Sequence, residues 1–327
     1  MEAEPMPGHA VVGGVGFVGA NLAEELVGRG YEVTVIGRKS SANKRPKLAR
    51  HLQSVGARLL LPPKLERRVY ERVAADVYYH VAGAVSGSLE AQRVPHVKLL
   101  DDIVRVAVEL GSRIVYVSSI GAVGTVRGAT AGTTIAEEER HLDPRVHVQE
   151  SNHEITKAEG ERLLVSASQR LRGRWSIVRP GLVFGPWGYH VEWRLSYRLS
   201  AMGISLDSSK RIPHIYSRDL ARILADAGEG EFDGKWVNAV DDLHPRLSDI
   251  TGIMCRELDR RCVRLNTWPL INALGRVAPK SSPLRVAYSI MRRGYVYSSR
   301  FLAGREWTPL EEQVKAFIEW ARSHGRA

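Results

Sequence analysis

The stretch "VVGGVGFVGANLAEEL", residues 11–26, decides the fold of this 327-residue chain. An apolar run ends at its first glycine, and a helical pattern begins near its last. The spacing fits G-x-G-x-x-G and also the variant that starts one residue earlier. Between a strand and a helix, such glycines turn the backbone tightly and turn the helix's first N–H groups toward a pyrophosphate. The stretch therefore predicts a dinucleotide site, with a purely structural turn as the alternative. The expected contacts are Gly13, Gly14, Gly16, Phe17, Val18 and Gly19.

Outward from this stretch, short runs rich in Val and Ile alternate with helical patterns as far as Pro186. This rhythm predicts an α/β fold, a doubly wound parallel sheet with helices on both faces. Residues 1–186 would form this Rossmann domain, and residues 211–240 would return to it. Residues 187–327 would form mainly a smaller substrate lobe, which ends in an amphipathic helix over residues 309–323.

The composition limits the possible partners and compartments. A net charge of +11 raises nucleic acid as a partner, but the cations are scattered among acids, which favours a solvated surface and no nucleic acid. No basic leader or long apolar run is present, so we expect a cytoplasmic protein. The two cysteines, Cys255 and Cys262, lack zinc-type spacing. We therefore expect a reducing compartment and no metal site.

The second apolar run ends in "VTVIGRKSS", residues 33–41, where an acidic residue would bind the ribose 2′-hydroxyl of NAD. Gly37 stands there instead. Two cations and a hydroxyl that could hold a 2′-phosphate follow, namely Arg38, Lys39 and Ser40. This favours NADP over NAD. The alternative is a basic surface loop, because Lys44, Arg45 and Lys47 follow closely.

Further motifs follow in a fixed order along the chain. They are "DVYYHVAGA" (76–84), "IVYVSSIGAVG" (114–124), "HEITKAEGERLL" (153–164), "IVRPGLVFGP" (177–186), "HIYSRDLARIL" (214–224) and "REWTPLEEQVKAFIEW" (305–320). With the glycine stretch, their order resembles that of the extended short-chain dehydrogenases/reductases over nearly the whole chain. The sequence is similar to the NAD-dependent epimerase/dehydratase family, including its 3β-hydroxysteroid dehydrogenase-like and dihydroflavonol reductase-like branches.

The resemblance implies catalytic roles for Ser119 and Lys157. In that family a tyrosine one helical turn before the lysine carries the proton, but here the position is His153. Imidazole can transfer protons but is shorter than a phenol, so a bridging water or Tyr189 could serve instead. A neighbouring ammonium would keep His153 neutral, which favours a base in alcohol oxidation. Alternatively, catalysis has been lost while cofactor binding persists.

The resemblance also implies contacts around the nicotinamide end of the cofactor. These would come from Val81, Ala82, Gly83, Ser118, Lys157, Pro180 and Val183. His96 stands where an asparagine is common. Candidate substrate contacts are Ser86, Tyr189 and Arg211, although Arg211 lies one place from the arginine that clamps a nucleotide-sugar phosphate in relatives.

The lobe is rich in aromatic and aliphatic residues, which suits a pocket for an apolar small-molecule substrate, while a plain second core explains the same composition at least as well. The resulting hypothesis is an NADP-dependent oxidoreductase acting on an apolar secondary alcohol or ketone. The alternatives are a nucleotide-sugar epimerase or dehydratase that uses NAD, and a catalytically impaired cofactor-binding protein. We expect a homodimer, packed through helices near residues 101–110 and 153–164. Prolines at 279 and 283 keep the basic, amphipathic pieces short, so we expect no stable membrane insertion.

Overall fold

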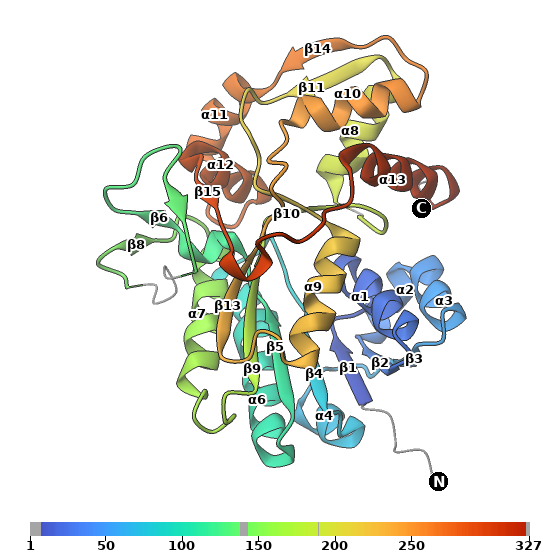
Figure 1. Ribbon diagram of the computed structural model, residues 1–327, viewed down its shortest axis with the longest axis vertical. Helices are drawn as coiled ribbons and strands as arrows, with labels where there is room; N and C mark the ends of the chain where they lie inside the picture. Colours follow the sequence, from blue (N-terminus) through green and yellow to red (C-terminus); the bar gives the residue numbers. More distant parts are fainter. Residues whose placement is uncertain (1–7, 138–142, 189, 325–327) are drawn as a thin grey trace.

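The computed structural model describes residues 8–137, 143–188 and 190–324, and it is built on one parallel sheet (Figure 1). Seven strands form this sheet. In spatial order they are β13 (Lys235–Ala239), β9 (Trp175–Pro180), β5 (Arg113–Val117), β4 (Val77–His80), β1 (Gly8–Val12), β2 (Glu32–Ile36) and β3 (Arg58–Leu60). The doubly wound parallel sheet predicted from the sequence is confirmed.

The first strand lies inside the sheet, and its register explains its composition. Val11 pairs with Val35 on one side and with Tyr79 on the other, both in parallel. Alternate residues of the strand point to opposite faces, and both faces are covered. The whole run must therefore be apolar, with no polar alternation.

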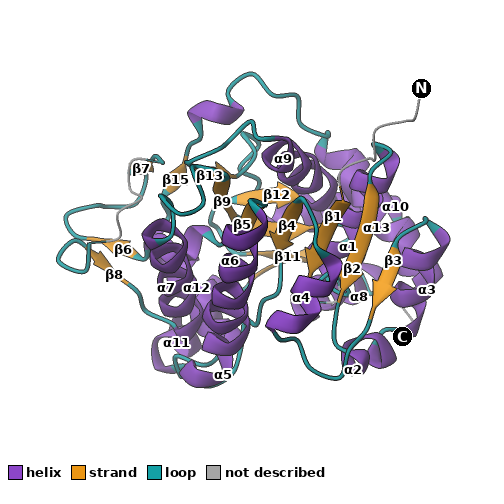
Figure 2. Cartoon of the chain, turned by 90° about the horizontal axis from the view of Figure 1, so that it is seen from below, coloured by secondary structure: helices purple, strands orange, loops and turns teal. Residues whose placement is uncertain are grey.

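Helices cover the two faces of the sheet (Figures 1 and 2). On one face α1 (Phe17–Gly28) packs against α9 (Ser217–Glu229), with α2 (Lys39–Lys44) and α3 (Pro46–Ser54) beyond. On the other face are α4 (Arg67–Val73), α5 (Leu89–Arg93), a π-helical turn (Val94–Lys98), α6 (Leu99–Leu110) and α7 (Asn152–Ser166). The sheet strands β9 and β13 follow α7 and α9 respectively.

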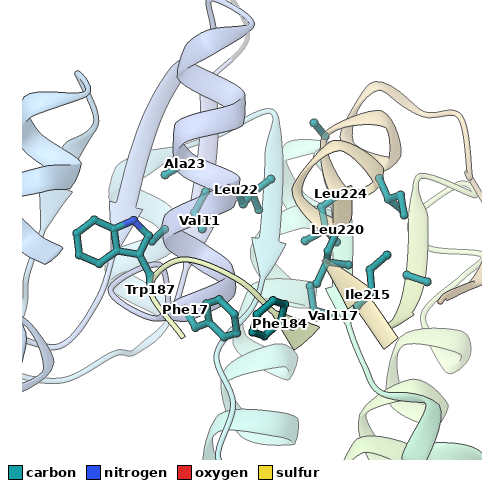
Figure 3. Packing of buried hydrophobic residues seen from close by; sticks show 14 of the residues in the cluster. Val11, Phe17, Leu22, Ala23, Val117, Phe184, Trp187, Ile215, Leu220 and Leu224 are labelled. Carbon is teal, nitrogen blue, oxygen red and sulfur yellow. The ribbon is translucent and has the colours of Figure 1, made fainter. Parts of the chain in front are cut away.

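The larger hydrophobic core lies between the sheet and the α1–α9 pair (Figure 3). It contains Val11, Phe17, Leu22, Ala23, Val117, Phe184, Trp187, Ile215, Leu220 and Leu224. A second core on the opposite face takes the alternate strand residues, such as Ala10 and Val12. Together the two cores fix the sheet's carboxyl edge, where the loops after β1, β4 and β5 meet.

The lobe occupies the carboxyl side of the sheet (Figure 1). Its helices are α8 (Val191–Ala201), α10 (Leu247–Glu257), α11 (Trp268–Val277), α12 (Pro283–Arg293) and α13 (Leu310–His324), with a 3₁₀ turn at Arg300–Leu302. Small two-stranded pairs join β10 (Leu182–Phe184) to β12 (His214–Tyr216) and β11 (Ile204–Asp207) to β14 (Val263–Asn266). The loops after β5 contribute a 3₁₀ turn (Ile120–Val123), β6 (Thr125–Val126), β7 (Thr134–Ile135) and β8 (His147–Val148), and β7 pairs with β15 (Val296–Tyr297).

The two cysteines form a disulfide, so the expectation of two reduced thiols is wrong. Cys255 lies near the end of α10, and the chain reverses through Asp259 before it reaches Cys262, the residue that precedes β14. This reversal brings the two Cα atoms to 6.2 Å, within the range that a disulfide bridges. Neither zinc-site spacing nor a multi-disulfide framework predicts a single bridge between two cysteines seven residues apart.

Across the part of the chain that the structure describes, no helix combines the length and apolar character needed to cross a membrane.

Candidate functional site

The glycine turn between β1 and α1 is shaped by close backbone contacts. Gly13 has φ +87°, and a Cβ there would lie 2.5 Å from the Cα of Ala82 in the loop after β4. A Cβ on Gly19 would lie 2.4 Å from the Cα of Gly14, so α1 could not approach the turn with any side chain there. The glycines thus hold the loops after β1 and β4 together and set the start of α1 against the turn.

The start of α1 suits a bound anion. Its N-cap is Gly16, which offers no side-chain cap, and its first turn contains no acidic residue. The first N–H groups of a helix lack intrahelical partners and carry partial positive charge. The turn therefore fits the pyrophosphate of a dinucleotide, with Phe17 and Val18 at the helix start.

The end of β2 lacks the carboxylate that binds a ribose 2′-hydroxyl, and any side chain there would require Val15 to shift. Gly37 is buried, and a Cβ there would lie 2.8 Å from Cγ2 of Val15. Arg38 follows as the exposed N-cap of α2. Lys39 and Ser40 are also exposed, in the first turn of that helix.

Arg45 joins this end of the site, although the sequence placed it in a basic surface loop. Its Nη1 donates a hydrogen bond of 2.8 Å to the carbonyl of Val15, inside the glycine turn. A Cβ on Gly16 would lie 3.8 Å from the same nitrogen. Sequence spacing could not reveal this contact, because it depends on how α2 folds back over the turn.

The two serines after β5 point in different directions. Ser119 begins the following 3₁₀ turn, and its Oγ accepts the N–H of Gly121 at 3.1 Å. Ser118 is buried, and its hydroxyl donates to Glu161 at 2.5 Å. Glu161 is in turn paired with Arg179 at 2.6 Å inside the protein. The hydroxyl of Ser118 therefore belongs to a buried polar cluster, while Ser119 remains the catalytic candidate.

Lys157 lies one turn into the buried face of α7. Its Nζ donates to the carbonyl of Val117 at 2.7 Å and lies 5.1 Å from the ring centre of Tyr116. A Cβ on Gly83 would lie 3.8 Å from Nζ, which places the lysine beside the loop after β4. Burial lowers the pKa of Lys157 to about 7, against the opposing attraction of Glu161.

His153 also faces the loop after β4. Its Nδ1 lies 3.1 Å from the carbonyl oxygen of Ala84, and a carbonyl can only accept, so Nδ1 carries the proton. Burial and then the charge of Lys157 lower the pKa of His153 to about 4. The ring is consequently neutral at pH 7, and Nε2 carries the unshared electron pair of an acceptor.

His96 braces the same loop from the π-helical turn. Its Nε2 accepts the N–H of Ala84 at 3.0 Å, so its proton is on Nδ1, which donates to the hydroxyl oxygen of Thr156 at 2.7 Å. The Thr156 hydroxyl donates onward to the carbonyl of Asn152 at 2.9 Å. In the sequence, His96 stands out only because asparagine is common at its position, and that substitution indicates no role for the imidazole.

Glu154, the residue after His153, bonds α7 to helix α12 of the lobe. The Oε1 atom of Glu154 accepts from Ser289 and from Arg293 of α12, each at 2.7 Å, and its Oε2 accepts the N–H of Glu150 at 2.6 Å. Glu154 and Arg293 are both buried. A lobe helix is therefore bonded directly beside the proton-carrying candidate.

The remaining predicted cofactor contacts lie at strand ends near these groups. Val81, Ala82 and Gly83 follow β4, and Gly83 is exposed beside Lys157. Pro180 ends β9, and Val183 lies in β10 immediately beyond it. These positions surround the same carboxyl edge of the sheet as the glycine turn.

The three residues predicted to contact the substrate are in different environments or outside the described residues. Ser86 is exposed in the loop after β4, and Tyr189 lies outside the described residues. Arg211 is exposed and donates to the carbonyl of His244 at 3.0 Å. Within residues 8–137, 143–188 and 190–324, no cluster of three His, Cys, Asp or Glu side chains could hold a metal ion.

Two tryptophans at the start of the lobe are part of the hydrophobic core. Trp187 and Trp193 belong to the main core, and their indole N–H groups donate to Glu24 at 3.0 Å and to the carbonyl of Val183 at 2.9 Å. Aliphatic side chains instead adjoin the 3₁₀ turn after Ser119. They form a cluster of Ile120, Val123, Val286 and Ile290, with Leu182 packed against it.

Many solved structures share the fold of this chain. The terminal R domain of the myxalamid PKS-NRPS pathway has a TM-score of 0.74 at 18% identity, covering 99% of this chain and 93% of that one. UDP-glucose 4-epimerase from Thermotoga maritima has a TM-score of 0.70 at 16% identity, covering 97% and 99%. The Bordetella bronchiseptica enzyme WbmH, solved with NAD+, has a TM-score of 0.69 at 16% identity, covering 98% and 99%.

A sequence search of curated proteins finds no match. The profile of the NAD-dependent epimerase/dehydratase family, however, matches residues 9–234, which include the glycine turn, both serines, His153 and Lys157. The chain therefore belongs to the NAD-dependent epimerase/dehydratase family.

Proposed function

We propose that this protein is an NADP-dependent oxidoreductase that interconverts a secondary alcohol and a ketone on an apolar small molecule. The observation that carries the proposal is the state of His153. Its Nδ1–H is bonded to Ala84, and it lies buried one helical turn before Lys157. A neutral imidazole held in one tautomer is a general base whose acceptor nitrogen is fixed.

The chain's own groups divide the binding and proton chemistry between them. When bound, NADP supplies the hydride acceptor or donor. The glycine turn would hold its pyrophosphate, and Lys157 would hold the nicotinamide ribose. Ser119 would hydrogen-bond the substrate oxygen, and Nε2 of His153 would take the proton of the alcohol, directly or through one water.

The protonation state favours the direction of alcohol oxidation. With a pKa of about 4, His153 holds no extra proton at pH 7, so it can accept a proton but has none to donate at Nε2. For the reverse reaction, a proton would have to reach Nε2 first. The loss of tyrosine at this position therefore leaves a neutral proton acceptor in its place and does not by itself remove the chemistry.

The preference for NADP is supported by charge and space at the end of β2. Gly37 offers no carboxylate, while Arg38, Lys39 and Arg45 bring positive charge to that end of the site. An apolar substrate rests on the aromatic and aliphatic composition of the lobe; the cluster of Ile120, Val123 and Ile290 beside Ser119 is itself buried core. A nucleotide-sugar remains the alternative, with Arg211 one place from the arginine that clamps the phosphate in relatives and one of its N–H groups bonded to the carbonyl of His244.

The proposal is tested with the full chain, NADP+ and a panel of secondary alcohols. We expect His153→Ala to abolish hydride transfer, followed by NADPH absorbance, while calorimetry shows unchanged NADPH affinity. His9→Gln, at the opposite end of the sheet, is the control and should keep its activity. If His153→Tyr gains activity over the parent, the imidazole is not the working base. If calorimetry detects no binding of NADPH or NADH, the entire proposal fails.

A further inference from the structure

The outer end of the lobe exposes an unusual amount of apolar surface. We define the crest as the exposed apolar side chains of this end, namely Met202, Val263, Leu265, Leu270, Leu274 and Val277. Among the described residues these include the most exposed large apolar side chains, with Val277 at 79%, Val263 at 76% and Met202 at 70%. Exposed apolar groups gathered on one part of a protein mark an interaction surface.

The helix of the crest cannot turn its apolar face inward. Leu270, Leu274 and Val277 are spaced four and three residues apart on α11, so they form one face of the helix. The packed side of α11 is set by Gly275, where a Cβ would lie 2.5 Å from Cβ of Tyr288 in α12. Such close packing fixes the rotation of α11 and keeps the apolar face toward solvent.

The strand of the crest adjoins this helix. One residue separates β14 from α11, and β14 pairs with β11 through the ladder that includes Ile204 and Val263. The N–H of Val263 donates to the carbonyl of Gly203 at 2.9 Å, which brings the neighbouring Met202 to the same strand. Figure 1 shows β14 at the outer end of the lobe and α11 running from there toward α12.

The charge around the crest is mainly positive, with two acidic groups beside it: Asp259 is exposed next to Arg260, and Asp207 lies 3.8 Å from the Arg264 guanidinium. From Arg260 to Arg305 the sequence contains ten Lys or Arg residues and no Asp or Glu. The exposed cations of this segment nearest the crest are Arg260, Arg261, Arg264, Arg276 and Lys280. A second copy presenting the same cations would be repelled, whereas an anionic surface would be attracted.

We propose that the crest docks this protein on the surface of an anionic phospholipid membrane. Short amphipathic helices with a cationic rim bind such surfaces by burying their apolar face among the headgroups, without spanning the bilayer. Trp268 at the start of α11, with the Lys210 ammonium 5.4 Å from its ring centre, adds the amphipathic aromatic that membrane interfaces favour. The proposal is independent of hydride transfer.

The test is vesicle flotation of the full-length protein. We expect it to float with vesicles of phosphatidylcholine mixed with phosphatidylglycerol, to float much less with phosphatidylcholine alone, and to be released by high salt. Leu270→Ser/Leu274→Ser/Val277→Ser should reduce the bound fraction at least about tenfold. Arg276→Glu/Lys280→Glu should weaken binding to anionic vesicles only.

The matched control carries three serines at exposed apolar positions away from the crest, Val146, Val148 and Leu243, and should bind as the parent does. Thermal melts establish that all variants are folded. The proposal is overturned if the parent binds no anionic vesicle, or if the α11 variant binds as well as the control. It is also overturned if the α11 variant changes only the oligomeric state in gel filtration, because the crest would then bind a second copy.

Discussion

His96 and His153 hold the same residue, Ala84, through its two backbone polar groups. His96 accepts the Ala84 N–H at 3.0 Å, and His153 donates to the Ala84 carbonyl at 3.1 Å. The tautomer of His153 is therefore set by a loop whose position depends on His96. This makes His96 a positioning residue for the proposed base.

Replacing His96 with Ala should loosen this loop without touching the cofactor. We expect kcat to fall roughly 10- to 100-fold, because the base loses its fixed orientation, while the calorimetric affinity for NADPH stays unchanged. Thr156→Val, which removes the acceptor of the His96 Nδ1–H, should reduce kcat in the same direction. An equal loss of NADPH affinity in both variants would show that His96 supports the fold in general.

Substituting Gly19 with Val should abolish cofactor binding and lower the free energy of unfolding by about 1–3 kcal/mol. The added carbons would meet the backbone of Gly14, which cannot move aside. Gly28→Ala in the same helix is the matched control, since nothing lies within 4 Å of its Cβ position. It should leave binding intact and add up to about 1 kcal/mol of stability. Urea unfolding and calorimetry measure both effects.

Arg38→Ala should weaken NADPH binding by about 1.5–3 kcal/mol, the contribution of a hydrogen bond to a charged group, and leave NADH binding nearly unchanged. The ratio of the two affinities is the measurement. Arg72→Ala, an exposed arginine on α4, controls for net charge. An unchanged ratio in Arg38→Ala would mean that the 2′-phosphate is bound elsewhere.

Stability should fall as the pH is lowered from 6.5 toward 4. Burial lowers the pKa of His9 and His153 to about 4 and that of His80 to about 3. Because these pKa values are depressed in the fold, the unfolded chain binds more protons in this window, and each such proton costs about 1.4 kcal/mol per pH unit. His9→Gln should reduce the slope of unfolding free energy against pH by about one proton. A slope unchanged by His9→Gln would contradict the burial of that ring.

Arg293→Met should destabilise the protein by about 3–5 kcal/mol, because it leaves the Glu154 carboxylate buried without its cation. Adding Glu154→Gln should recover part of this loss. Arg292→Met is the neighbouring control: its guanidinium is bonded to Glu150 but is largely exposed, so the loss should stay below about 1 kcal/mol. Equal losses for the two arginines would show that the Glu154 pair is not closed to solvent.

Much of the fold follows from local patterns in the sequence. The Val- and Ile-rich strands and the glycine spacing are local, and the sheet and turn formed where they predicted. The four-residue step from His153 to Lys157 places both on one side of α7, as helical periodicity requires. The predicted terminal helix over residues 309–323 corresponds to α13, Leu310–His324.

Other parts of the site depend on contacts between distant segments. The Glu154–Arg293 pair joins residues 139 positions apart, and Arg45 reaches the glycine turn across 30 positions. No periodicity encodes such pairs. For the same reason composition alone cannot separate a pocket wall from a second core, and both readings of the lobe's tryptophans stay open at the level of sequence.

The bridge between Cys255 and Cys262 links α10 to the residue before β14, and β14 carries two of the crest residues. It follows that reductant is an experimental variable for this protein. A thiol in the buffer would free β14 from that anchor, so experiments with and without dithiothreitol would concern two covalently different molecules.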